Sequence, residues 1–196
     1  MIWRYVYYGA CTLVLAAITH IAIILLIPLY GTQDAFAILS KSTEPFSFKP
    51  ITSENGRLPL SDFDPFFSYG VCRFDLSEQG LAISGPKIDT FWSATIVNEA
   101  GTVVYSLNSR TAIDQKLEMI VLNSTQILRI RELQPPEVES SIIVETEIDG
   151  GFVLLRVLSP DESWDSSARR FLNAISCEPY IPVAGQKPDE ENQPGS

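Results

Sequence analysis

The first thirty residues contain the feature that most limits how this chain can fold. The stretch Ile2–Leu29 carries one charged residue, Arg4. Its part Tyr5–Leu29 is apolar over about 25 residues, and a helix of that length, rising about 1.5 Å per residue, exceeds the ~30 Å hydrocarbon core of a bilayer. Aromatic residues that prefer the headgroup region stand at both ends, namely Trp3, Tyr5, Tyr7, Tyr8 and Tyr30. Residues 1–31 are therefore predicted to form a transmembrane helix.

Two other interpretations of this stretch stay open. A cleaved signal peptide has an apolar core of only about 7–15 residues, although Ala35-Phe36-Ala37 resembles a small-residue cleavage site. A buried core helix needs a large domain around it, and few residues remain to build one. Arg4 before the segment and Asp34 after it favour a cytoplasmic N-terminus and an exported C-terminal part.

His20, the only histidine of the chain, lies near the middle of the predicted span. An ionisable group at that depth usually faces a partner or a cavity rather than lipid. A neutral imidazole that bonds to a backbone carbonyl one turn back, or to Thr19 of a neighbouring helix, is the alternative. We expect His20 to lie in an intramembrane contact between helices.

Charge and cysteine content restrict the chemistry of the rest of the chain. The net charge of −10 argues against a nucleic-acid surface, which needs clustered Lys and Arg. Outside the span there is no histidine and there are two cysteines, too few ligands for a zinc site. In an oxidising compartment Cys72 and Cys177 are the only pair available for a disulfide, but the sequence does not show whether their Cα atoms approach closely enough. Cys11 lies in the span.

The chain divides into four parts. Pro28 marks the expected end of the transmembrane helix, and residues 32–62 form a connector. Within the connector, Gln33–Lys41 is predicted to form a short amphipathic helix on the membrane surface, followed by an extended stretch broken by prolines. Residues 63–181 form the exported domain, and residues 182–196 have the composition of a disordered tail.

The exported domain alternates short apolar runs with turn-forming residues, which is typical of β proteins. The predicted strands are Tyr69–Leu76, Leu81–Ser84, Phe91–Val97, Thr102–Leu107, Leu117–Leu122, Ser141–Glu147 and Phe152–Leu158. Turn chemistry at Ser77–Gly80, Gly85–Pro86 and Asn98–Gly101 predicts an antiparallel meander of the first four strands, and Ile148–Gly151 predicts a hairpin between the last two.

The remaining patterns complete the expected fold. In the first strand Cys72, Phe74 and Leu76 alternate with polar residues, so one face is expected to be buried. Ser124–Leu133 and Pro160–Ser176 have capping residues and apolar stripes typical of covering helices. We therefore expect a mainly β fold, an antiparallel, jelly-roll-like β-sandwich with one or two covering helices behind one N-terminal transmembrane helix.

Four blocks of the sequence, Asp64–Ser77, Phe91–Ser93, Asn98–Thr111 and Gly151–Arg156, resemble a bacterial family of domains of unknown function. In that family the domain occurs as a small protein behind one transmembrane helix, or as the first half of larger exported two-domain proteins. The resemblance implies a jelly-roll-like β-sandwich and a companion small membrane protein as partner. The first block is shorter here than in the larger members, and the family has no established catalytic residue to carry over.

One polar cluster stands out at the end of the fourth predicted strand. Asn108, Arg110 and Thr111 follow one another there, and with Arg73 on a nearby strand they are candidates to bind a carboxylate or phosphate. The alternative is a structural role, in which Arg110 satisfies loop carbonyls or pairs with Asp114. Arg156, in an apolar strand, is expected to pair with Glu145 across the predicted hairpin.

No catalytic set is recognisable in the sequence. Without an exported histidine there is no Ser-His or Cys-His pair, and no spacing brings a given serine to Lys87. Asp75, Asp89 and Asp114 are possible paired carboxylates, yet aspartates at turns and strand ends are common for structural reasons. We assign no catalytic, cofactor or metal-binding residue.

These observations favour a single-pass inner-membrane protein with a cytoplasmic N-terminus, whose periplasmic sandwich is a noncatalytic interaction or envelope-assembly subunit with the companion protein. One alternative is an enzyme, or half of one, with an active site at the interface of the two proteins, acting on an envelope glycan or lipid-linked substrate. Another is a periplasmic small-ligand binding module. A polar cleft with perturbed acids around Asp75 or Asp114 would favour the enzyme, and an open apolar cavity between the sheets would favour the ligand binder. A filled interior together with a flat apolar patch would favour the assembly role.

Overall fold

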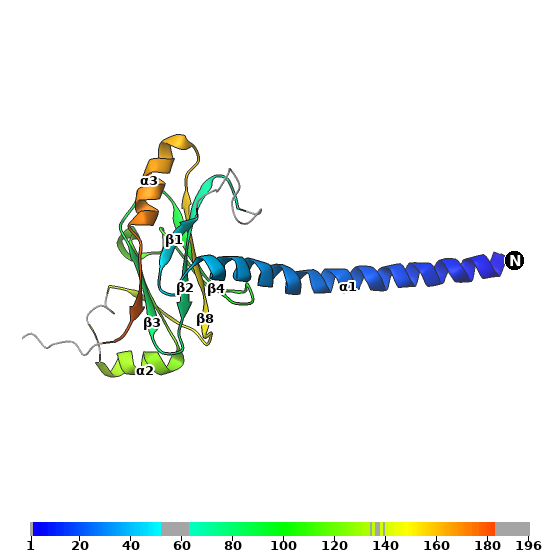
Figure 1. Cartoon of the computed structure of the whole chain (residues 1–196), viewed down its shortest axis with the longest axis horizontal. Helices are drawn as coiled ribbons and strands as arrows, with labels where there is room; N and C mark the ends of the chain where they lie inside the picture. The colour runs from blue at the N-terminus through cyan, green and yellow to red at the C-terminus, as the bar shows by residue number, and fades with distance from the viewer. Residues whose placement is uncertain (1, 52–62, 134, 136–137, 139, 183–196) are drawn as a thin grey trace, which may run out of the picture.

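A computed structural model of the chain describes residues 2–51, 63–133, 135, 138 and 140–182, with the backbone alone over 28–42. One long helix projects from a domain of two packed β-sheets with a helix at each end (Figure 1). The predicted fold class, a mainly β sandwich behind one N-terminal apolar helix, is confirmed.

Helix α1 spans Ile2–Ser42. Its segment Ile2–Ile27 has a mean hydropathy of 2.6 and is exposed along its whole length, so it is long and apolar enough to cross a membrane. The predicted helix end at Pro28 and the separate helix over Gln33–Lys41 are wrong, because one helix continues to Ser42. A proline removes one backbone hydrogen bond, while the turns before and after it retain theirs.

The strands of the described residues form two sheets. The five-stranded sheet has the order β1-β2-β8-β4-β5 and consists of Phe48–Ile51, Phe67–Asp75, Gly150–Leu158, Trp92–Asn98 and Val103–Asn108. The four-stranded sheet has the order β7-β6-β3-β9 and consists of Ile142–Glu145, Leu117–Leu122, Gly80–Gly85 and Ser176–Tyr180. Neighbouring strands are antiparallel except β6 and β7, which are parallel.

Two predicted connections are wrong. The meander fails because β2 and β3 belong to opposite sheets, and of the predicted turns in it only the one at Asn98–Gly101 joins hydrogen-bonded neighbours, β4 and β5. The hairpin at Ile148–Gly151 fails for the same reason, since β7 and β8 lie in different sheets. Turn residues show where a chain reverses, but a reversal can equally carry it across a sandwich to the other sheet.

The helices close the two ends of the sandwich. Helix α2 spans Ser124–Leu133, as predicted, and helix α3 spans Glu162–Asn173, inside the predicted range; a short 3-10 helix covers Ile113–Gln115. Figure 1 places α2 and α3 at opposite ends of the domain. Trp92 and Phe171 stack with ring centroids 6.5 Å apart, which ties α3 to the core.

Large apolar side chains fill the space between the sheets. The largest of the fully buried ones are Trp92, Phe74, Leu76, Leu81, Ile83, Ile96, Leu117, Met119, Leu122 and Leu155. The predicted alternation in β2 is confirmed, because Cys72, Phe74 and Leu76 are buried whereas Asp75 and Ser77 are exposed. Both sheets thus contribute their inner faces to one core.

Candidate functional site

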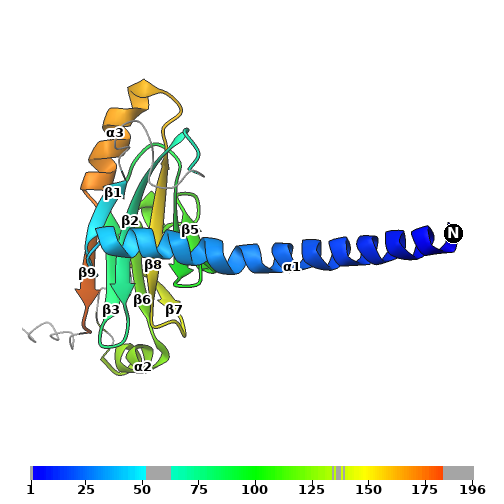
Figure 2. The same ribbon diagram turned by 45° about the vertical axis from the view of Figure 1, so that its right-hand side comes forward.

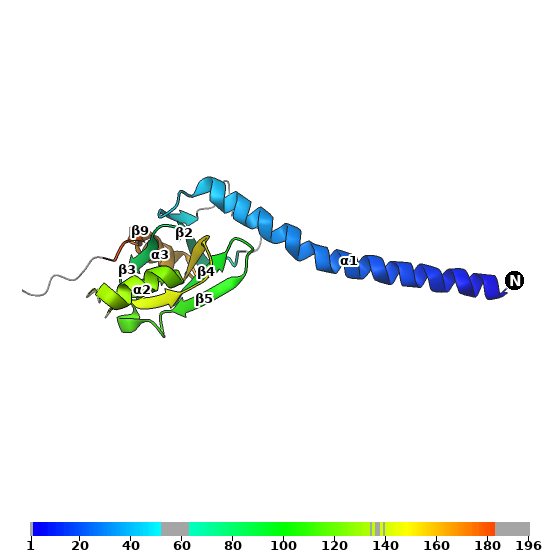
Figure 3. The same ribbon diagram turned by 90° about the horizontal axis from the view of Figure 1, so that it is seen from below.

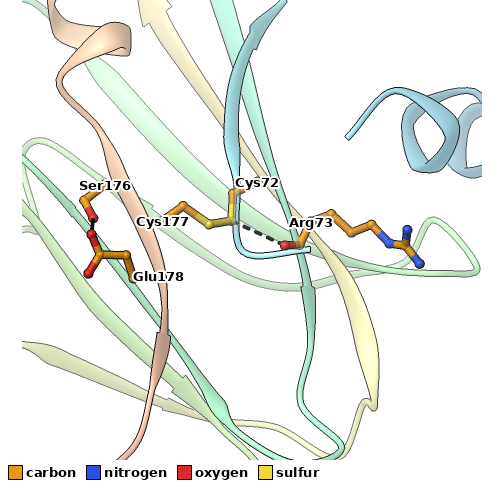
Figure 4. The surroundings of a disulfide bond; sticks show 5 residues. All are labelled: Cys72, Arg73, Ser176, Cys177 and Glu178. Atoms are coloured by element: carbon orange, nitrogen blue, oxygen red, sulfur yellow. Dashed lines mark hydrogen bonds between the residues drawn. A yellow bond between two sulfur atoms is a disulfide. The ribbon is translucent and has the colours of Figure 1, made fainter. Parts of the chain in front are cut away.

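The sulfur atoms of Cys72 and Cys177 are joined in a disulfide, shown in Figure 4. Cys72 lies on β2 and Cys177 on β9, so the bond links the two sheets across the core, with a Cα–Cα distance of 6.4 Å. Cys72 is completely buried and Cys177 is 6% exposed. Figure 4 also shows that Arg73, the next residue of β2, points to the opposite side of the sheet.

The structure does not bring Arg73 to the other members of the predicted polar cluster. Arg73 pairs with Phe152 on β8, and Phe152 pairs with Val97 at one end of β4. Asn108 on β5 pairs with Ser93 at the other end of β4. Because these positions are three strands apart and at opposite ends of the sheet, Arg73 cannot share a small ligand with Asn108.

Asn108 and Thr111 build the turn that follows β5. The Asn108 Oδ1 atom accepts hydrogen bonds from the backbone N–H of Arg110, at 2.9 Å, and of Thr111, at 3.3 Å. The Thr111 hydroxyl donates to the Asn108 carbonyl at 3.2 Å. This is the self-bonded turn that Asn favours, so both residues have a structural role, while Arg110 is exposed.

The arginine with the best-defined surroundings is Arg156. The predicted pair with Glu145 is wrong, because Glu145 lies on β7 in the other sheet. Instead, Nε of Arg156 donates to Oγ of Ser93 at 2.6 Å, and the guanidinium carbon lies 5.5 Å from the centre of the Phe67 ring. Finding these contacts requires the strand order β2-β8-β4, which no local pattern in the sequence reveals.

The aspartates considered as catalytic pairs are separate surface groups. Hydrogen bonds from the hydroxyl and the backbone N–H of Ser77 hold the pKa of Asp75 below its ordinary value of 3.8, and the charge of Arg73 adds to this effect. Asp114 is exposed in the 3-10 helix, and Asp89 borders a shallow hollow beside α3. Among the described residues no three His, Cys, Asp or Glu side chains gather as metal ligands.

His20 lies on the exposed surface of α1, where it borders a shallow groove along the helix. The groove is lined by Thr12, Leu15, Ala16, Thr19, His20 and Ile23. The hydroxyls of Thr12 and Thr19 donate to the carbonyls of Tyr8 and Leu15 in the same helix, at 2.8 and 2.9 Å. The groove therefore combines two threonines whose hydroxyls bond within the helix, three apolar side chains and one imidazole.

A further hollow of about 630 Å³ is open to solvent between α2 and β7. Its described lining consists of Ile127, Ile130, Arg131, Pro135, Val138, Ile143 and Glu145. It lies outside the sandwich, whose interior is occupied by the core side chains.

Comparisons with known proteins identify similar folds and assign no function. No protein-family profile and no curated protein matches the chain. The VPA0106 protein of Vibrio parahaemolyticus has a similar fold, with a TM-score of 0.55 and 11% identity over 84% of this chain and 41% of that chain. An uncharacterised protein from Burkholderia cenocepacia also has a similar fold, with a TM-score of 0.50 and 14% identity over 74% of this chain and 38% of that chain. The chain thus spans about two fifths of each of these bacterial neighbours of unknown function.

Proposed function

We propose that the chain is a single-pass protein of a bacterial inner membrane, and that its periplasmic sandwich is a noncatalytic interaction or envelope-assembly subunit of a complex with a companion small membrane protein. The observation that carries this proposal is the fully exposed apolar surface of Ile2–Ile27. A helix of this composition that packs on none of its own domain requires lipid or another apolar helix around it.

The orientation rests on charge and on the disulfide. Arg4 precedes the apolar segment, which favours a cytoplasmic N-terminus. The Cys72–Cys177 bond belongs to the part of the chain that then lies in the periplasm, where disulfides persist.

Two surfaces support a partner. The groove at His20 places three small side chains, Thr12, Ala16 and Thr19, beside a polar imidazole, and membrane helices use small and polar residues where they contact each other. In the domain, β5 is an edge strand that exposes Val103 and Val104, and exposed apolar edges are normally covered. The filled interior, one of the two features expected of the assembly role, argues against a ligand cavity between the sheets.

The test is purification of the full-length chain, expressed at its native level, in mild detergent, with mass spectrometry of the proteins that accompany it. We expect one small membrane protein in fixed proportion. Replacement of Tyr5–Leu29 by a polyleucine segment should abolish its retention, because the segment would still span the membrane without the groove.

Two single variants sharpen this experiment. His20→Leu should reduce partner retention, whereas Ile21→Leu, at the adjacent exposed position outside the groove, should not. Isolation of the wild-type chain alone, or equal retention by the polyleucine chain, would reject the companion-subunit proposal.

A further inference from the structure

Arg156 lies on the outer face of the five-stranded sheet, because its neighbours Leu155 and Val157 point into the core. Figure 2 shows the C-terminal part of α1 passing in front of β2 and β8, and Figure 3 shows this part of α1 on the side of the domain where β2 lies. We propose that Arg156, with Ser93 and Asn108 beside it, binds a phosphate group on this face. The proposal goes beyond the companion-subunit role and does not rest on it, since every group involved belongs to this chain.

The guanidinium of Arg156 is held in a defined orientation. Its Nε atom donates to Ser93 Oγ at 2.6 Å, and Ser93 is only 3% exposed, so this anchor is buried. The Phe67 ring lies against the cation at 5.5 Å. With one edge bonded and the plane supported by an aromatic ring, the two terminal NH₂ groups, which bond to no other described residue, can form the paired hydrogen bonds that arginine makes to phosphate.

The polar side chains next to Arg156 in the sheet, Ser93 and Asn108, have N–H or O–H groups that donate to no described residue. Ser93 accepts from Arg156, which leaves its hydroxyl proton unused by the described residues. Asn108, paired with Ser93 in the sheet, has its Oδ1 atom occupied by two backbone N–H groups, and its NH₂ group donates to no described residue. Arg156 and Asn108, which lie on either side of the buried Ser93 in the sheet, therefore offer several donors and a positive charge to an oxyanion.

No carboxylate of the described residues neutralises this charge. The contacts of Arg156 with described residues are those with Ser93 and Phe67, neither of which is acidic, and Glu145, its predicted partner, lies in the opposite sheet. Asp64 lies near Tyr69, the residue of β2 that pairs with Arg156, because its backbone N–H donates to the Tyr69 hydroxyl. The Asp64 carboxylate accepts from the backbone N–H of Phe66 at 2.9 Å. In a chain with a net charge of −10, an arginine that is held in place by Ser93 and Phe67 and that pairs with no described acid points to an external anion.

The test follows the Nε–H signal of Arg156 by nuclear magnetic resonance in the full-length chain in dodecyl maltoside. The signal is identified as the one missing from Arg156→Gln. Sodium phosphate should shift it saturably, and sodium chloride at equal ionic strength should not. Phosphate affinities of the variants are compared by isothermal titration calorimetry, because Arg156→Lys has no Nε–H group. Ser93→Ala should weaken phosphate binding about tenfold or more because the guanidinium loses its anchor, and Arg156→Lys should do so because lysine cannot form the paired hydrogen bonds.

The control variant is Arg73→Gln, which removes a positive charge from the same face at the opposite end of the sheet and should bind phosphate like the wild type. Nanodiscs of phosphatidylcholine with and without phosphatidylglycerol, free of inorganic phosphate, identify the source. A shift only with phosphatidylglycerol assigns the site to a lipid headgroup, and a shift only with inorganic phosphate assigns it to a soluble phosphate compound. Absence of both shifts, or equal phosphate affinity in Arg156→Lys, Ser93→Ala and the wild type, overturns the proposal.

Discussion

Single residues form contacts between parts of this protein that are distant in the sequence. Cys72 and Cys177 are 105 residues apart and join opposite sheets. Gly151 lets β8 approach β4 without a side chain between them. At the same scale, Arg156 meets Ser93 and Phe67 from three different strands. Each of these positions carries an interaction that its sequence neighbours do not indicate.

Loss of the disulfide should lower the free energy of unfolding by about 4 kcal/mol, because a bridge that closes a loop of this length restricts the unfolded chain. The measurement is urea unfolding of Cys72→Ala/Cys177→Ala in a Cys11→Ser background, compared with Cys11→Ser alone. If both thiols of the unreduced protein react with an alkylating reagent, the bridge is absent and the prediction fails.

Gly151→Ala should lower the free energy of unfolding by about 2 kcal/mol or more. A Cβ atom at this position would lie 2.3 Å from the backbone oxygen of Val97, so β4 and β8 would have to separate. At Gly85 the same 2.3 Å conflict involves Cδ1 of Ile175, the end of a flexible side chain, and Gly85→Ala should be milder. Equal losses in urea unfolding would contradict this explanation.

Helices and strands differ in how fully their own residues specify them. α2 has the predicted bounds because local signals set both ends: Asn123 caps its start by accepting from the backbone N–H of Gln126, and Pro135 follows its end. β9 was not predicted, and the prediction extended the preceding helix to Ser176 instead. Ser176–Tyr180 contains glutamate and proline, which strands disfavour, and it becomes a strand by pairing with β3 at the edge of the sheet.

The start of α3 should give its stability a defined pH dependence. Asp161 accepts hydrogen bonds from the hydroxyl and the backbone N–H of Ser163, which hold its pKa below the ordinary value of 3.8. Because the folded pKa is lowered, the stabilising contribution is present above the unfolded value and is lost as the pH falls through the folded value.

Asp161→Ala should therefore be less stable than the wild type at pH 6, with a difference that shrinks as the pH falls below about 4. Urea unfolding from pH 6 to pH 2.5 measures this difference. Glu162→Gln, a neighbouring change in the same first turn, is the control and should show a smaller effect at pH 6. A difference for Asp161→Ala that stays constant across this range would disprove the capping explanation.

At the scale of the whole molecule, the sandwich and the apolar segment are built as separate units. The core clusters of the described residues contain side chains of the domain, and every residue of Ile2–Ile27 is exposed. The apolar segment therefore contributes no described side chain to the core, and the domain is expected to fold without it.

Deletion of residues 1–27, with export directed by a cleavable signal sequence, should release the protein from membranes and leave its melting temperature within about 2 °C of the full-length value. Sedimentation of membranes and thermal unfolding of the two proteins measure these outcomes. Continued membrane association, or a much lower melting temperature, would show that the segment is not the sole anchor or that it stabilises the domain.

The sequence by itself determined the apolar N-terminal helix, seven of the strands, both covering helices and the sandwich class, because these follow from local hydrophobic period, length and turn chemistry. Only the tertiary structure decided which strands are neighbours. It separated β2 from β3 and β7 from β8, removed Arg73 from Asn108, and placed Ser93 beside Arg156. The physical reason is that strand order depends on how complete apolar faces fit against each other across the core, and no short stretch of sequence contains that information.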